Sequence, residues 1–107
     1  MNMINNPILA TGKVECRYTK RGQRIFIEGG KAAKAGFTRH GPYTRTITSG
    51  KIVLTVGGDR KCSGRVKNGV SSPTIDISMK QIGDFATGEK LSVTYYNGSI
   101  TIERIAA

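Results

Sequence analysis

The chain has 107 residues, which is enough for one domain that buries roughly 65% of the surface its unfolded form would expose. Its 37% hydrophobic and 22% charged residues are typical of a soluble globular protein and not of a chain that is disordered as a whole. The formal net charge of +10 favours an anionic partner such as nucleic acid, although a high charge of one sign can also serve only to keep a small protein soluble.

No stretch of the sequence predicts a membrane segment. No apolar run approaches the length of a bilayer span, and residues 1–12 lack the basic start and the apolar block of a signal peptide. We therefore expect a cytoplasmic protein with no membrane partner.

The basic residues are concentrated in the first two thirds of the chain. Residues 1–67 contain fourteen basic and three acidic side chains, a balance of +11. Residues 68–107 contain three basic and four acidic ones, a balance of −1. If charge marks the binding surface, that surface belongs to residues 1–67.

The N-terminal part predicts a flexible tail followed by a basic hairpin. Residues 1–11 are polar and are expected to form the tail. Apolar and charged residues alternate over 13–18, which predicts a half-buried strand. Residues 20–23 predict a turn, and residues 24–28 the return strand.

A short helix and a second hairpin are predicted next. Residues 30–36 are rich in alanine and lysine and end at a glycine, which favours about two helical turns. The β-branched residues of 43–48 and 51–56 predict strands around Ser49-Gly50. Residues 57–59 interrupt the pattern and connect the two halves of the chain.

The second half predicts the same order of elements. Residues 71–73 are expected to be a connector, 74–77 a short strand, and 79–84 a second short helix with Ser78 as its N-cap. Residues 90–96 and 99–104 flank Asn97-Gly98, the strongest hairpin signal in the chain. One face of this hairpin is predicted to be buried, namely Leu91, Val93 and Tyr95 with Ile100 and Ile102.

The two halves are predicted to be copies of one unit. The apolar residues and glycines of the first half recur 48 to 50 positions later, which indicates one supersecondary unit used twice. The matching pairs are Ile25 and Ile75, Ile27 and Ile77, Phe37 and Phe85, Gly50 and Gly98, Ile52 and Ile100, and Leu54 and Ile102. We therefore expect a single domain at 12–107 made of two repeats, 12–56 and 60–106.

An I-x-I strand that leads into a short helix, followed by a hairpin ending in GKIVL or GSITI, resembles the SpoVT/AbrB-like swapped-hairpin family. The resemblance implies a mainly β fold with two short helices, a small swapped-hairpin barrel formed as an intramolecular pseudo-dimer. It also implies DNA binding and transcription regulation through a basic hairpin. The proline that usually follows the I-x-I strand is absent, and the second copy lacks the basic hairpin, which puts a symmetric grip on palindromic DNA in doubt.

The leading functional prediction is a nucleic-acid-binding protein, most directly for duplex DNA. Lysine and arginine can neutralise phosphates, and arginine can also read guanine in the major groove. The candidate binding residues are Lys13, Arg17, Lys20, Arg21, Arg24, Lys31, Lys34, Arg60, Lys61, Arg65 and Lys67. The last four are expected to extend the line of basic residues that the first hairpin begins. The protein is expected to be a monomeric pseudo-dimer or a homodimer.

Two other functions remain open. The near-neutral second repeat could bind a protein, as in an inhibitor or accessory factor of a mobile element that blocks a host nucleic-acid-processing machine. Single-stranded RNA or DNA could instead stack on a tyrosine. The candidates for stacking are Tyr18, Tyr43, Tyr95 and Tyr96.

The sequence does not predict an enzyme, a metal site or a cofactor. Cys16 and Cys62 alternate with strand residues and are expected to be reduced core residues, and His40 is expected in a loop. Gly29-Gly30-Lys31 lacks the spacing of a phosphate-binding loop. Asp76, Asp84 and Glu89 have no evident acid–base partner.

Overall fold

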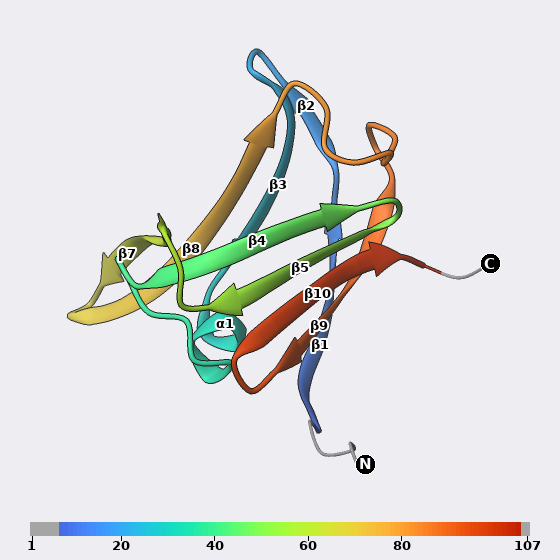
Figure 1. The fold of residues 1–107 in the computed structure, drawn as a ribbon. Coiled ribbons are helices and arrows are strands. Elements are labelled where there is room, and N and C mark those ends of the chain that lie inside the picture. Colours follow the sequence, from blue (N-terminus) through green and yellow to red (C-terminus); the bar gives the residue numbers. More distant parts are fainter. Residues whose placement is uncertain (1–6, 106–107) are drawn as a thin grey trace.

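Ten strands and one short helix make up the described part of the chain. The computed structural model describes residues 7–105, apart from the side chains of Glu28, Arg65 and Lys67. The first half contains β1 (Ile8–Glu15), β2 (Arg17–Thr19), β3 (Gly22–Glu28), α1 (Gly30–Lys34), β4 (Pro42–Thr48) and β5 (Lys51–Val56). The second half contains β6 (Arg60–Lys61), β7 (Ser63–Lys67), β8 (Val70–Met79), β9 (Lys90–Tyr96) and β10 (Ser99–Arg104). The protein is therefore mainly β, as the sequence predicts (Figure 1).

The strands form two antiparallel sheets and not the closed barrel that was expected. The six-stranded sheet has the order β1-β9-β10-β5-β4-β6, and the four-stranded sheet has the order β2-β3-β8-β7. The chain passes from the larger sheet to the smaller one at Cys16 and again at Cys62, and it returns between β3 and β4 and between β8 and β9. The prediction of a closed barrel is wrong because, among the described residues, β1 and β6 end one sheet and β2 and β7 end the other.

Each strand of the first half has a counterpart five strands later, so that β1 corresponds to β6 and β5 to β10. If every strand is replaced by its counterpart, the order of both sheets is the same, read from the other end. At the centre of the sheets, β3 pairs with β8 and β5 pairs with β10. At the two ends of the larger sheet, β1 pairs with β9 and β6 pairs with β4. Each half of the chain thus supplies an edge strand to the hairpin of the other half, an arrangement with approximate twofold symmetry.

The backbone around the two cysteines repeats this symmetry. Each cysteine exchanges two hydrogen bonds with a loop of the other half of the chain, and the partner residues are 48 positions apart. The bonds run from Cys16 N–H to Glu89 O (2.9 Å), Gly88 N–H to Cys16 O (2.6 Å), Cys62 N–H to Gly41 O (2.9 Å) and His40 N–H to Cys62 O (3.0 Å). Both cysteines are buried free thiols at these bends, which confirms their predicted place in the core.

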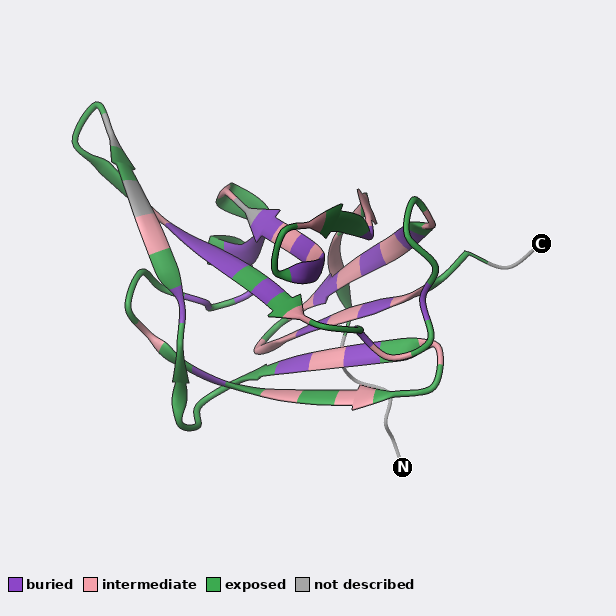
Figure 2. Cartoon of the chain, turned by 90° about the horizontal axis from the view of Figure 1, so that it is seen from above, coloured by how far each residue is buried: buried purple, intermediate pink, exposed green. Residues whose placement is uncertain are grey.

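The core lies between the two sheets and is built from matching residues of the two halves. Buried residues face each other across the central strand pairs, and buried and exposed positions alternate along the strands (Figure 2). The facing pairs are Ile25 with Ile77, Ile27 with Ile75, Ile52 with Ile102 and Leu54 with Ile100. Burial of an aliphatic side chain of this size contributes roughly 1.5–3 kcal/mol, so these eight residues tie the two halves together.

The predicted hairpins are present, and the first of them is altered by a bend. The bounds of β5, β9 and β10 agree with the prediction, and the predicted inner face of β9 and β10 is buried. The single strand expected at 13–18 is divided by Cys16 into β1 and β2, which belong to different sheets. Furthermore, β1 begins at Ile8, inside the stretch 1–11 for which a tail is predicted.

The prediction of a second helix at 79–84 is wrong. The strand β8 continues through 71–73, where a connector was expected, and ends at Met79, which pairs with Gln23 of β3. The Gln23 side chain then accepts a hydrogen bond from the Ile82 N–H at 2.7 Å, and Gly83 adopts a positive φ of 53°. Both features hold the segment out of a helix. The remaining helix, α1, has five residues, and no described helix is long and apolar enough to span a membrane.

Candidate nucleic-acid interface

The hairpin of β2 and β3 carries the densest group of basic residues. Arg17 lies directly opposite Arg24 in the strand register, and the turn between the strands is formed by Lys20 and Arg21. The Thr19 hydroxyl stabilises this turn, because it donates to the Gly22 carbonyl at 3.0 Å and accepts from the Arg21 N–H at 3.2 Å. The turn therefore presents its cations from a fixed backbone.

Five of the predicted binding residues line two adjoining hollows on the outer side of this hairpin. One hollow of about 520 Å³ is lined by Lys13, Val14, Glu15, Arg17, Arg24 and Phe26. The other, of about 360 Å³, is lined by Thr19, Lys20, Arg21, Arg24, Asp76 and Ser78. Because Arg24 belongs to both, the two hollows form one surface with five cations and two acids, which we call the basic face.

Arg24 is held in place at the centre of the basic face. Its Nε lies 3.0 Å from Asp76 Oδ1, and its guanidinium carbon lies 4.7 Å from the centre of the Phe26 ring. Ser78 donates a second hydrogen bond to the same Asp76 oxygen at 3.1 Å. Since the ion pair is more than one third exposed on both sides, it contributes little to stability, and its main effect is to fix the orientation of Arg24.

The two predicted lysines of α1 line neither hollow of the basic face. The Lys31 ammonium group donates to the Thr11 carbonyl of β1 at 2.6 Å, which attaches the helix to that edge strand. Lys34 is exposed in the last turn of the same helix. The helix packs against β8 and β3, at the other end of β3 from the Lys20-Arg21 turn (Figure 1).

The backbones of the predicted connector residues belong to β6 and β7 and not to the first hairpin. Arg60 and Lys61 form β6, which is separated from β1 by four strands, a distance of roughly 24 Å at normal strand spacing. The backbone of Arg65 and Lys67 belongs to β7, at the opposite end of the smaller sheet from β2, while their side chains lie outside the described residues. The backbones of these four residues are therefore not adjacent to β2, and β7 is separated from β2 by the strands β3 and β8.

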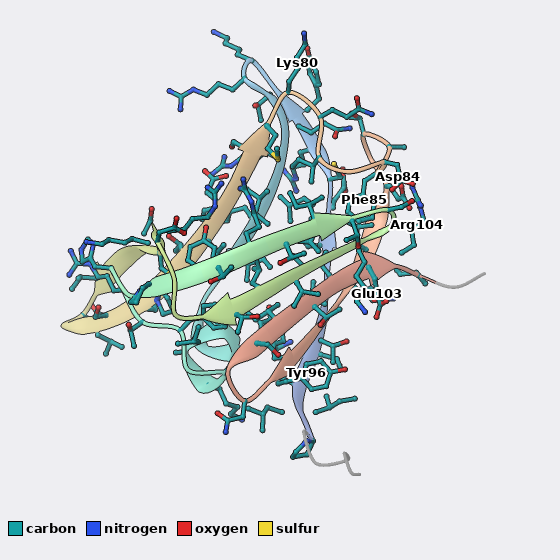
Figure 3. The ribbon with its side chains drawn as sticks, viewed as in Figure 1. Lys80, Asp84, Phe85, Tyr96, Glu103 and Arg104 are labelled. Atoms are coloured by element: carbon teal, nitrogen blue, oxygen red, sulfur yellow. The ribbon has the colours of Figure 1, made fainter. Side chains whose placement is uncertain are left out.

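Two further cations, Lys80 and Arg45, are not among the candidate binding residues predicted from the sequence. Lys80 follows β8 and stands beside the tip of the β2–β3 hairpin (Figure 3). Arg45 of β4 lies near Arg60, and burial, together with the charge of Arg60, lowers the pKa of Arg45. Neither residue belongs to a basic cluster in the sequence. Each is brought to its site by the pairing of strands that are distant in the sequence.

The four tyrosines differ in exposure. Tyr43 and Tyr95 are buried in the core, where desolvation raises the pKa of both hydroxyls. Tyr96 is half-buried, whereas Tyr18 is 71% exposed. Among the large hydrophobic residues described as exposed, Tyr18 has the highest exposed fraction. It is therefore the tyrosine that a partner can reach most easily.

The described residues contain no group of three or more His, Cys, Asp or Glu side chains placed to hold a metal ion. Burial raises the pKa of both the Cys16 and the Cys62 thiols, and the charge of Glu89 adds to the effect at Cys16. The neutral thiol is a poor nucleophile.

No protein-family model matches the chain, and no similar curated protein or solved structure was found.

Proposed function

We propose that the chain is a nucleic-acid-binding protein that holds duplex DNA on the basic face, in the manner of a small transcription regulator. The observation that carries the proposal is the placement of Arg17 directly opposite Arg24. Like charges in facing positions of an antiparallel pair destabilise a sheet. A polyanion bound across the pair would remove this repulsion.

The second half of the chain supports this interpretation. At the equivalent position next to Cys62, the facing residues are Ser63 and Thr74, which are uncharged. The fold can therefore be made without two arginines in this place. The repulsion in the first hairpin is then a cost of function and not a requirement of folding.

The basic face also has the chemistry that DNA binding requires. Its five cations can neutralise phosphates, while Asp76, one of its two acids, is already bonded to Arg24. A fixed arginine fork can form two hydrogen bonds with guanine in the major groove, and a two-stranded ribbon fits into that groove. Arg24, which is held by Asp76 and Phe26, is the residue best prepared for this role.

The approximate twofold arrangement supports a further part of the proposal, a relation to the swapped-hairpin fold. The pairing of β1 with β9 and of β6 with β4 makes each half complete the other. The resemblance does not extend to barrel closure. In this proposal the two repeats act as a pseudo-dimer with a single DNA-binding hairpin.

A mobility-shift titration with duplex DNA across a salt series tests the proposal. If about five phosphates are neutralised, the slope of log affinity against log salt concentration should be roughly −4 to −5. Absence of binding to duplex DNA at low salt would rule out the proposal.

The second hairpin favours one other function, binding to a protein. Near its tip, Val66 and Val70 are 53% and 67% exposed. Exposed apolar side chains mark a protein interface when they form part of a larger patch. An inhibitor or accessory factor of a mobile element would use this end of the molecule, and a pull-down that survives nuclease treatment and high salt would support it.

A further inference from the structure

The inner side of the first hairpin carries a second surface feature, the exposed ring of Tyr18. Tyr18 lies opposite Gln23, one position along from the facing pair Arg17 and Arg24. Because successive side chains of a strand point to opposite faces, Tyr18 projects away from the basic face. It lines an open hollow of about 660 Å³ together with Gln23, Met79, Lys80, Gln81 and Thr87.

The walls of this hollow are fixed by the fold. The Gln23 amide donates to the Phe85 carbonyl at 2.9 Å and to the Thr87 hydroxyl at 3.4 Å, and its oxygen accepts from the Ile82 N–H at 2.7 Å. A Cβ atom at Gly22 would lie 2.7 Å from the Lys80 Cα, so the hairpin packs closely against the end of β8. The hollow is thus formed before any partner binds, and its volume lies within the range of known ligand sites, roughly 300–1,000 Å³.

We propose that this hollow binds an unpaired nucleobase, stacked on Tyr18, of the same nucleic acid whose phosphates lie on the basic face. Every base has a π-face that can stack on an aromatic ring, and such contacts are common in sites for unpaired nucleotides. Lys80 at the rim supplies a cation for the neighbouring phosphate, and the Gln81 amide can donate to and accept from a base edge. The inference rests on the proposed function, because the basic face supplies most of the affinity.

The position of the turn links the two surfaces. Lys20 and Arg21 stand at the tip of the hairpin, where they form the end of the basic face, and Tyr18 lies on the other side of the same hairpin. A nucleic-acid strand that leaves a duplex on the basic face can pass this tip and reach the hollow. We therefore expect a preference for a duplex that carries an unpaired nucleotide over a blunt duplex of equal length.

Fluorescence offers a direct test, because the chain contains no tryptophan. Tyr18→Trp places a single indole in the hollow, and Val70→Trp places one at the exposed tip of the second hairpin as a matched control. A duplex with a single-stranded overhang should quench and shift the emission of the Tyr18→Trp protein and leave that of the Val70→Trp protein unchanged. An equal response of both proteins, or no response of the Tyr18→Trp protein to a bound overhang, would overturn the inference.

Affinity measurements with Tyr18→Ala and Tyr18→Phe separate this site from the basic face. Loss of a base stack should weaken binding of the overhang substrate roughly 5- to 150-fold for Tyr18→Ala, while Tyr18→Phe retains binding. Binding of a blunt duplex should change less than about twofold, since the phosphate contacts remain. An unchanged affinity of Tyr18→Ala for the overhang would overturn the site while the proposed function stands. Absence of any binding by the wild-type protein would overturn both.

A free nucleotide distinguishes the source of the base. Adenosine monophosphate has the base but lacks the duplex phosphates, so it should quench the Tyr18→Trp protein only at concentrations far above those of the overhang duplex. Quenching at equal concentrations would instead assign the hollow to free nucleotides and overturn the inference.

Discussion

The hairpins β2–β3 and β7–β8 occupy equivalent places in the two halves, yet their surfaces differ. The first has three facing residue pairs and four basic residues in positions 17–24. The second has five facing pairs, an Asn68-Gly69 turn with positive φ at both residues, and two basic residues in positions 63–72. Since both hairpins continue into the same central pair of strands, the fold requires the backbone pattern and the inward apolar residues, and does not require the cations of the first hairpin.

The largest expected effect comes from breaking the part that the two hairpins share. Ile77 of β8 is fully buried opposite Ile25 of β3, so Ile77→Asp would place a charge in the core that joins both halves. The cost should be several kcal/mol, comparable to a total stability of about 5–15 kcal/mol. We expect loss of the β signal in circular dichroism, whereas Ser78→Asp, at the next and exposed position, should leave the protein folded. A folded Ile77→Asp protein would contradict the assigned core.

A smaller effect should separate the two turns. Gly22 has a φ of 109°, and an added Cβ would overlap the Met79 carbonyl oxygen. Gly69 has a φ of 77°, and an added Cβ would meet no atom within 4 Å. Gly69→Ala should therefore cost only the left-handed backbone strain of about 1–2 kcal/mol, and Gly22→Ala more than about 3 kcal/mol. Urea denaturation measures both, and equal losses would show that the first hairpin does not depend on its contact with β8.

The smallest effect concerns the loop between β8 and β9, which occupies the place in the second half that α1 occupies in the first. The Ala35 carbonyl, which follows α1 in the first half, accepts a hydrogen bond from the Gly98 N–H. In the equivalent place of the second half, the Asp84 carboxylate accepts one from the Gly50 N–H at 2.8 Å. Hydrogen bonds from Ser49 and Gly50, with a further one from Arg104, hold the pKa of Asp84 below its usual value of 3.8. Figure 3 shows Arg104 beside Asp84 and Phe85.

A depressed carboxyl pKa gives stability that is present above the pKa of the unfolded chain and is lost as pH falls through the folded pKa. Asp84→Asn should therefore lower the thermal midpoint slightly at neutral pH. The difference from the wild type should shrink as the pH falls below about 4. Asp59→Asn, in the exposed connector, is the control with the same change of charge. A difference that is constant down to the lowest pH would exclude a role for the ionised carboxylate.

The parts predictable from the sequence are those set by local patterns. Alternation and turn residues predicted the bounds of β5, β9 and β10. The repeat also identified residues that meet at the centre of the larger sheet, but it matched Ile52 with Ile100, whereas the strand register places Ile52 opposite Ile102. Arg17, Lys20, Arg21 and Arg24 are close in sequence and share a hairpin, so their grouping could be expected.

The remaining features depend on contacts between distant segments. The bend at Cys16 is set by hydrogen bonds to residues 88 and 89, and a strand pattern does not encode it. Gln23 holds the Ile82 N–H and prevents the expected helix, although Met79 to Asp84 has local helix signals. Sheet order, which a local pattern does not determine, places Arg60 and Lys61 at the edge opposite β1 and brings Lys80 to the first hairpin.

The most direct measurement is the salt dependence of DNA binding by a variant in which the facing pair of the first hairpin is replaced by that of the second. Arg17→Ser with Arg24→Thr copies Ser63 and Thr74, and Lys51→Ser with Lys61→Thr removes the same charge elsewhere. If the basic face binds DNA, the slope of log affinity against log salt should become shallower by about 1.8 in the first double variant and stay unchanged in the second. Urea denaturation should find both proteins as stable as the wild type within about 1 kcal/mol. Equal changes of slope in the two variants would show that only net charge matters, and would contradict the assignment of binding to the first hairpin.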